Sequence, residues 1–327
     1  MPELRVVQLG MRTRFRGITV REVAFVRGRS GGWPSGGGWG EWSPFVEYDA
    51  REVEPWLRCA EEAGAGAWPR PVRDSVPVNV TVPAVGPEHA QRLVAGSGCG
   101  TAKVKVAEPG QSLGEAVERL AAVRDALGPG GRIRIDANGA WEVEAAVSAI
   151  AVLDRAAGGL EYVEQPCRSV EELAAVRRKV AVPIAADESI RRAEDPFRVR
   201  DLEAADVAVI KVQPLGGVAA GLRIAEAIGL PVVVSSALES SVGIAAGVAL
   251  AAALPELPYA CGLATVALLT DDVVADPLLP VDGALPVRAA LQPSEEALTR
   301  LAAPPDRQRW WQARLAEVYR LREDHRR

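Results

Sequence analysis

Histidine and paired cysteine are scarce in this 327-residue sequence. Only His89 and His325 occur, so the commonest catalytic base of enzymes is nearly missing. No two cysteines form a CxxC pair, which argues against a zinc site or a disulfide framework and indicates reduced thiols in a cytoplasmic protein. The four cysteines lie far apart along the chain, at Cys59, Cys99, Cys167 and Cys261.

Long apolar runs are also missing. The first fifteen residues contain no apolar core that would serve as a secretory signal. The most apolar stretch, residues 242–254, is too short to span a membrane and is rich in alanine, as a buried helix would be. A formal net charge of −5 argues against general nucleic-acid binding. We therefore expect no membrane insertion and no nucleic-acid partner, and these patterns specify no oligomeric state.

A regular alternation begins at about Val76, where short β-branched runs start to alternate with amphipathic stretches rich in Ala, Leu, Glu and Arg. Such alternation is typical of βα units, and eight units over roughly 200 residues fit a (β/α)₈ barrel. An open doubly wound sheet is disfavoured, because no glycine-rich dinucleotide fingerprint follows the first strand. The expected strands begin near Val76, Ala102, Arg132, Leu160, Val182, Asp206, Leu230 and Tyr259.

The two ends of the chain follow a different pattern. Two strand-like runs near the N-terminus precede a Gly/Trp-rich segment, whose Trp33, Trp39 and Trp42 we expect to serve packing, and then a helix-like run from Ala50. The end of the chain is first proline-rich and then helical. We expect an α+β capping domain over residues 1–75, a catalytic (β/α) barrel over 76–276, and a C-terminal segment over 277–327 that packs back on the cap.

Charged and polar residues stand at the predicted carboxyl ends of successive strands, where a barrel places its catalytic groups. Three of them, Asp136, Glu164 and Asp187, are separated by 28 and 23 residues, about one βα unit each. Their carboxylates should therefore converge. In strand order the whole set is Lys103 with Lys105, Asp136 with Asn138, Glu164, Asp187 with Glu188, Lys211, and Ser235 with Ser236.

Three converging carboxylates repel one another unless a hard divalent cation holds them, which predicts Mg²⁺ with Mn²⁺ as a substitute. Burial near a cation should lower the pKa of the flanking lysines, so that a lysine can act as a general base. Together these groups suit removal of a proton beside a carboxylate, because the enediolate that forms needs concentrated positive charge. On the residues alone, a structural network of paired ions stays open as an alternative.

These residues resemble the motifs of the enolase superfamily, specifically the subgroup with a lysine on each face of the site. The matching motifs are KVK at 103–105, DAN at 136–138, EQP at 164–166 and DES at 187–189, with Lys211 opposite. The pairing of a lysine base with Mg²⁺ is a known feature of that superfamily. The resemblance implies a (β/α)₇β TIM-type barrel with an α+β capping domain formed by the N-terminal region and the C-terminal tail. It also implies that Asp136, Glu164 and Asp187 bind the Mg²⁺.

Within the superfamily, the chain most resembles the o-succinylbenzoate synthase family. The residues that carry this narrower resemblance are GWGEWSPF at 38–45, SSALESS at 235–241 and GLAT at 262–265. That family dehydrates 2-succinyl-6-hydroxy-2,4-cyclohexadiene-1-carboxylate to 2-succinylbenzoate in menaquinone biosynthesis. The expected partner is thus a small-molecule carboxylate substrate.

The resemblance also implies a role for each lysine. Lys105 would remove the proton next to the carboxylate and then assist departure of the hydroxyl, while Lys211 would stabilise the enediolate from the other face. Lys103 would position or polarise the carboxylate. The substrate contacts expected from the strand ends are Ser235, Ser236 and Asn138.

Several alternatives remain at this point. N-acylamino acid racemases and muconate cycloisomerases use the same pair of lysines. Dipeptide epimerases carry an Asp-x-Asp in strand eight, whereas residues 261–265 read CGLAT and contain no acid. A non-catalytic binding protein on this scaffold would be expected to lose the ligand positions, and here every one is filled.

Overall fold

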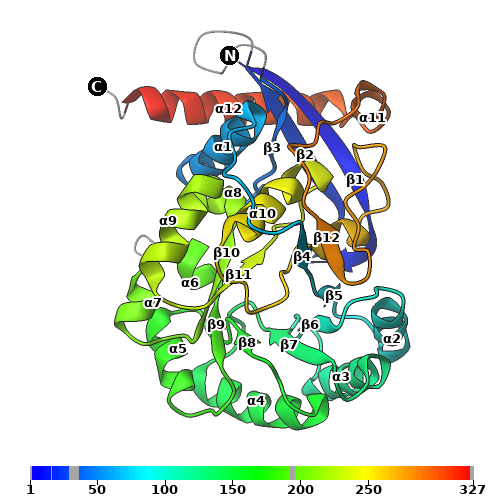
Figure 1. Cartoon of the computed structure of the whole chain (residues 1–327), viewed down its shortest axis with the longest axis vertical. Coiled ribbons are helices and arrows are strands. Elements are labelled where there is room, and N and C mark those ends of the chain that lie inside the picture. The colour runs from blue at the N-terminus through cyan, green and yellow to red at the C-terminus, as the bar shows by residue number, and fades with distance from the viewer. Residues whose placement is uncertain (1, 16, 29–36, 192–195, 325–327) are drawn as a thin grey trace.

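The computed structural model describes residues 2–15, 17–28, 37–191 and 196–324, so Trp33 and His325 lie outside the described residues (Figure 1). Its centre is a curled parallel sheet with the strand order β11-β10-β9-β8-β7-β6-β5. The strands are short and almost wholly buried, because helices cover one face and the barrel interior the other. They are β5 (Val80–Val82), β6 (Thr101–Lys105), β7 (Arg132–Asp136), β8 (Val163–Glu164), β9 (Ile184–Ala186), β10 (Val207–Lys211) and β11 (Val232–Ser235).

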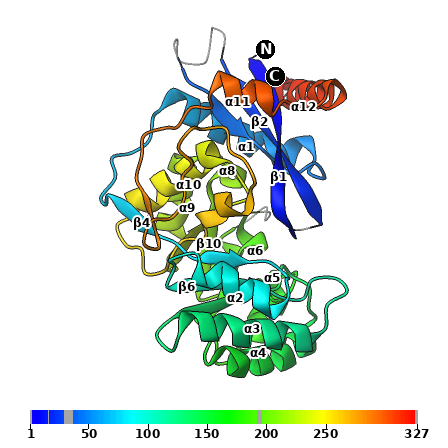
Figure 2. The same ribbon diagram turned by 90° about the vertical axis from the view of Figure 1, so that its right-hand side faces the viewer.

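Helices connect these strands and surround the sheet in both views (Figures 1 and 2). Helical crossovers of this kind are what parallel neighbouring strands require. The arrangement confirms the predicted barrel fold class. In chain order the helices are α2 (Pro87–Ala95), α3 (Leu113–Leu127), α4 (Val143–Ala157), α5 (Val170–Arg177), α6 (Glu188–Arg191), α7 (Arg198–Asp201), α8 (Val212–Leu215), α9 (Val218–Ile228) and α10 (Ser241–Ala253).

The predicted eighth strand is reduced to two residues. Cys261 forms a parallel bridge to Val78, and Gly262 forms one to Ser235. These bridges connect the last strand of the sheet to the first, so the barrel closes without an eighth βα unit, and the chain continues into η1 (Ala264–Leu268). The predicted first strand is divided too, because β4 (Ser75–Pro77) pairs with β12 (Ala284–Pro286) outside the parallel sheet.

Helix caps fix the loops that leave the strands. The sequence S-x-x-E at 112–115 predicts a capping box, and the structure has it: Glu115 N donates to Ser112 Oγ at 3.3 Å, and Ser112 N to Glu115 Oε2 at 2.7 Å. Ser169 and Glu172 repeat the arrangement at the start of α5. Each capping box satisfies first-turn amide groups at the end of a loop that leaves a strand of the parallel sheet.

The cap combines both ends of the chain. An antiparallel sheet of β1 (Glu3–Phe15), β2 (Ile18–Arg27) and β3 (Gly40–Trp42) packs with α1 (Ala50–Ala65), followed at the far end of the chain by α11 (Glu295–Arg300) and α12 (Pro305–Asp324). Figure 1 shows α12 lying across the top of the molecule beside α1. Trp42 and Trp311 meet edge to face, with ring centroids 5.4 Å apart. The boundaries at 75 and 276 stay predictions.

Residues 23–26 of strand β2 are buried on both faces of the strand, which joins the cap to the barrel. Ala24 and Val26 face a core shared with α1 and α12. Val23 and Phe25 face the opposite way, into a core that includes Val242 of α10. Because side chains alternate along a strand, Arg21 lies on the same barrel-facing side as Val23. In the ranges that the structure describes, no helix is long and apolar enough to cross a membrane.

Candidate active site

The period of two along each parallel strand directs the candidate residues into the barrel. In β10, Ala208 and Ile210 belong to the core under the helices, whereas Val207 and Val209 fill the barrel interior. Lys211 continues the interior row and ends the strand at the carboxyl edge of the sheet. The same alternation brings to that edge Thr81, Lys103, Lys105, Asp136, Glu164, Asp187 and Ser235.

Lys103 and Lys105 contact the carboxylates of the next strands. Lys103 Nζ lies 3.0 and 3.1 Å from the two oxygens of Glu164 and 3.4 Å from Asp136 Oδ2. Lys105 donates to Asp136 Oδ2 and, at 2.6 Å, to Asn138 Oδ1. One ammonium is thus shared between two carboxylates, and the second spans the D-A-N turn.

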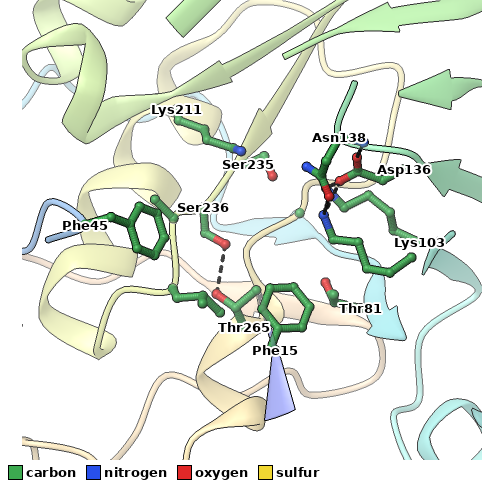
Figure 3. Close-up of a pocket in the computed structure, with 14 residues that line it drawn as sticks. Phe15, Phe45, Thr81, Lys103, Asp136, Asn138, Lys211, Ser235, Ser236 and Thr265 are labelled. Carbon is green, nitrogen blue, oxygen red and sulfur yellow. Dashed lines mark hydrogen bonds and ion pairs between the residues drawn. The ribbon is translucent and has the colours of Figure 1, made fainter. Parts of the chain in front are cut away.

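Lys211 approaches the pocket from the side opposite Lys103. Its Nζ donates to Asp187 Oδ2 at 2.5 Å, while Arg191 Nε donates to the other oxygen, Asp187 Oδ1, at 3.0 Å. Arg191 also contacts Glu188 and the hydroxyl of Tyr48 in the cap. Figure 3 shows Lys211 and Lys103 on opposite sides of the pocket.

Burial and charge displace several pKa values in this cluster. Burial raises the pKa of Glu164 to about 7, with a further contribution from the nearby charge of Asp136 that Lys103 only partly opposes. For Asp187, burial is outweighed by Arg191 and Lys211, which lower its pKa to about 2. The pKa of Asp136 is lowered as well, since Lys105 and Lys103 outweigh its burial. Glu164 is therefore the carboxylate of this cluster whose charged form is least favoured, chiefly because it is buried.

The lysines do not share one electrostatic state. Burial lowers the pKa of Lys211, against the opposing charge of Asp187, in the direction that the sequence predicted. Burial also acts on Lys103, but Glu164 and Asp136 outweigh it and raise the pKa of that lysine. The direction at Lys103 follows from two carboxylates within 3.4 Å of its ammonium group, and the lowering expected beside a bound cation stays a prediction for this lysine.

The acidic residues fit a divalent cation in identity and burial. Asp136, Glu164 and Asp187 are at most 1% exposed, and they end three adjacent strands. In the described part of the chain, however, no three carboxylate, imidazole or thiol groups are already grouped as metal ligands. Lysine ammonium groups lie against these oxygens instead. Burial and the nearby charge of Asp136 disfavour the charged form of Glu164, and a hard cation at this position would stabilise it.

The pocket in front of this cluster has about 400 Å³ of space, part of it open to solvent. The predicted contact residues Asn138, Ser235 and Ser236 all line it. Ser236 Oγ lies 2.8 Å from Thr265 Oγ1, a hydroxyl pair that Figure 3 shows below the lysines. Two aromatic rings from the cap, Phe15 and Phe45, complete the wall.

Several residues of the site had no role assigned to them from the sequence. Thr81 lies in the middle of the first strand of the parallel sheet, β5, and lines the pocket, so a rule that reads only the last residue of each strand passes over it. Arg191 stands four residues after Asp187, a spacing that places two side chains on one helical face. Gln165, whose backbone has a φ of +40°, accepts from the amides of Asp187 and Ser189, and so fixes the end of β9. Phe15 at the β1–β2 turn gave no sequence signal.

Comparison with known proteins places this geometry among related chains. The family model "enolase C-terminal domain-like" matches residues 87–292, and "enolase N-terminal domain-like" matches residues 6–64. The chain is 65% identical over 312 residues to o-succinylbenzoate synthase of Thermobifida fusca, which covers 95% of this chain and 94% of that protein. It is 54% identical to o-succinylbenzoate synthase of Mycolicibacterium smegmatis, with 98% and 96% covered.

Solved structures agree on the architecture. Muconate lactonizing enzyme from Pseudomonas fluorescens superposes with a TM-score of 0.78 at 22% identity, covering 93% of this chain and 98% of that one. L-Ala-D/L-Glu epimerase from Bacillus subtilis gives a TM-score of 0.72 at 22% identity, with 90% and 97% covered. At such identities the likeness shows the fold.

Proposed function

The chain belongs to the enolase superfamily, and from this premise we propose that it catalyses the reaction of an o-succinylbenzoate synthase. That reaction dehydrates 2-succinyl-6-hydroxy-2,4-cyclohexadiene-1-carboxylate to 2-succinylbenzoate, a step of menaquinone biosynthesis. The observation that carries the proposal is the placement of lysines on opposite sides of one pocket, around three buried carboxylates. Relatives at 54–65% identity over nearly the whole chain point to the substrate.

Lys105 is the proposed acid and base. It ends β6 at the pocket wall, and its partners Asp136 and Asn138 hold its ammonium group at the carboxyl edge of the sheet. As the free amine it takes the proton from the carbon next to the carboxylate. The same nitrogen then donates that proton to the hydroxyl leaving the neighbouring carbon, so water departs and the ring becomes aromatic.

Lys211 and Lys103 are proposed to act through charge. Lys211 reaches the pocket from β10, which three strands separate from β6 in the sheet, and so faces the other side of the bound ring. Its ammonium stabilises the enediolate as negative charge develops on the carboxylate oxygens. Lys103 lies deeper in the barrel, against Glu164, and orients the carboxylate of the substrate.

Asp136, Glu164 and Asp187 are the proposed ligands of Mg²⁺, for which Mn²⁺ can substitute. When bound, the metal supplies concentrated positive charge that makes the proton next to the carboxylate acidic. For these residues to bind it, the lysine contacts to their oxygens must loosen. Ser235, Ser236 and Asn138 are proposed to contact the rest of the substrate, and the reduced, buried state of the four cysteines fits a cytoplasmic location.

A direct assay tests the proposal against its nearest alternative. Racemisation of an N-succinylamino acid uses the same two lysines but requires each to exchange a proton on its own face. With Mg²⁺ present, we expect turnover of the cyclohexadiene carboxylate to 2-succinylbenzoate, followed by absorbance and mass, to exceed racemisation in kcat/KM. Efficient racemisation without dehydration would overturn the assignment.

A further inference from the structure

One wall of the pocket is held by the cap. Arg21 of β2 is 3% exposed, and its guanidinium donates to the carbonyl oxygens of Leu238, at 3.2 Å, and Ala237, at 3.3 Å. The same group lies 4.4 Å from the centroid of the Phe45 ring. All three of these contacts are residues that line the pocket. A single cap side chain therefore touches the pocket wall from behind at three points.

The wall segment does not adopt a relaxed conformation. Leu238 has a φ of +65°, in the left-handed region that non-glycine residues avoid. Glu239 folds back so that its Oε2 accepts from the amide of Ala237 at 2.6 Å. Such a conformation persists only where surrounding contacts determine it, and the Arg21 bonds on both flanking carbonyl groups are contacts of that kind.

A second cap residue holds the far end of the same segment. Glu41 of β3 is 2% exposed and accepts from Ser240 Oγ at 2.5 Å and from the amide of Gly243 at 2.9 Å. The fit is close, since a Cβ added to Gly243 would lie 2.8 Å from Glu41 Cδ and 2.6 Å from Glu239 Cβ. Residues 237–243 thus form hydrogen bonds with the cap sheet at both ends of the segment.

The hydrogen bonds between cap and barrel continue toward Lys211. Ser43 Oγ donates to Glu41 Oε1 at 2.6 Å, and the amide of Ser43 donates to Gln213 Oε1 at 3.2 Å. Gln213 stands two residues after Lys211. The cap is therefore tied to the ends of β10 and β11, the side of the pocket that lacks the carboxylate cluster.

We propose that Arg21 and Glu41 are positioning residues: they hold residues 237–243 in the shape that binds substrate, and their loss weakens substrate binding more than proton transfer. The inference rests on the proposed function only for the identity of the substrate. The hydrogen bonds described for Arg21 and Glu41 go to Ser43 and to the wall segment, whereas Lys105, Lys211 and the carboxylate cluster contact one another.

The test compares Arg21→Lys with Arg27→Lys. Arg27 lies on the same strand and stacks on Trp39 at 4.4 Å, but it contacts no pocket residue, so it is the matched control. A lysine at 21 keeps the charge but lacks the planar fork of donors with which Arg21 bridges the two carbonyl groups. We expect Arg21→Lys to raise KM at least about tenfold, the effect of losing one charged hydrogen bond, with kcat within about threefold of wild type. Arg27→Lys should leave both constants unchanged.

Hydrogen–deuterium exchange of the 236–243 amides keeps the inference testable without any substrate. Exchange there should be at least about tenfold faster in Arg21→Lys than in wild type or Arg27→Lys. If Arg21→Lys does not fold, Glu41→Gln serves, because it keeps the shape of Glu41 but removes its charge and replaces one of its two acceptor oxygens by an NH2 donor. Unchanged exchange or an unchanged KM in the folded variant overturns the inference. If the wild type turns over no cyclohexadiene carboxylate, while exchange is still faster in Arg21→Lys than in wild type, the proposed function alone is contradicted.

Discussion

Two buried acidic groups in this molecule differ in what surrounds them. The strand-end cluster, Asp136, Glu164 and Asp187, faces a pocket and is contacted by lysine ammonium groups. The junction pair, Glu41 and Glu239, lies between cap and barrel and is contacted by hydroxyl and amide groups, with Arg21 beside it. Both groups are at most 4% exposed.

The difference in surroundings indicates different roles: the strand-end cluster takes part in the chemistry, and the junction pair positions the pocket wall. Hydroxyl and amide donors are fixed dipoles that satisfy a carboxylate permanently, whereas ammonium groups can exchange partners and protons. The strand-end cluster can therefore release its lysines to a cation and a substrate. The hydrogen-bond donors around the junction pair belong to the neighbouring chain and stay in place, so the pair holds the segment that it contacts.

Removing one strand-end carboxylate should have the largest effect. Asp187→Asn keeps the shape but loses the charge that a divalent cation needs, so we expect kcat/KM for dehydration to fall at least about 10⁴-fold. Circular dichroism should remain that of the wild type. The control is Asp206→Asn, at the opposite end of β10, where the carboxylate accepts from Ile184 N and Arg177; its turnover should persist. Full activity of wild type in excess chelator would contradict the metal assignment.

The two lysines should differ in how much dehydration survives their replacement. Arginine keeps the charge but cannot act as a base near neutral pH. We expect Lys105→Arg to lower kcat roughly 10³-fold and Lys211→Arg roughly 10²-fold, since the second role is electrostatic. Single-turnover kinetics would measure both. Substantial dehydration by Lys105→Arg with none by Lys211→Arg would place the base on the other face.

The junction pair should show itself in the pH dependence of stability. Burial and the neighbouring Glu239 charge raise the pKa of Glu41 to about 7, against 4.5 for an ordinary glutamate. The folded state therefore binds the proton more tightly, and the stability that this supplies is complete below about pH 4.5 and lost as pH rises through about 7. It amounts to roughly 3 kcal/mol in the free energy of unfolding.

Urea unfolding at several pH values measures this contribution. Glu41→Gln cannot titrate, so the fall in stability between about pH 4.5 and 7 should be smaller than in wild type by that amount. An identical pH slope in the two proteins would show that Glu41 has an ordinary pKa.

A cap contact away from the pocket wall should affect stability alone. Glu62 of α1 accepts from the amides of Val218, at 2.5 Å, and Ala219, at 3.0 Å, and so caps α9 of the barrel. Glu62→Ala should lower the free energy of unfolding by about 1 kcal/mol, the usual cost of removing a side chain that caps the N-terminus of a helix. KM should stay at the wild-type value, and a rise as large as that of Arg21→Lys would remove the distinction between wall contacts and other cap contacts.

The strand-end cluster was predictable because it follows from local pattern. A period of two and a spacing of one βα unit suffice to bring Asp136, Glu164 and Asp187 to one edge, and Ser112 with Glu115 announces α3 within four residues. The junction pair was not predictable. Glu41 and Ser240 are 199 residues apart, and no periodicity relates them. In isolation Glu239 suggests a helix start, yet the N-cap of α10 is Ser240.

Other differences between expectation and structure have similar causes. Strand eight shrinks to Cys261 and Gly262 because closing the barrel needs only one bridge on each side. The lysine–carboxylate pairs depend on side-chain reach across strands, which sequence spacing does not encode. The oligomeric state likewise has no signal in these patterns.

Titration calorimetry of Mg²⁺ tests the contrast between the two acidic groups most directly. It compares wild type, Asp187→Asn in the strand-end cluster and Glu239→Gln in the junction pair. The account predicts that wild type and Glu239→Gln bind Mg²⁺ with similar affinity and that Asp187→Asn gives no binding heat. Binding that survives in Asp187→Asn, or that disappears in a folded Glu239→Gln, would contradict it.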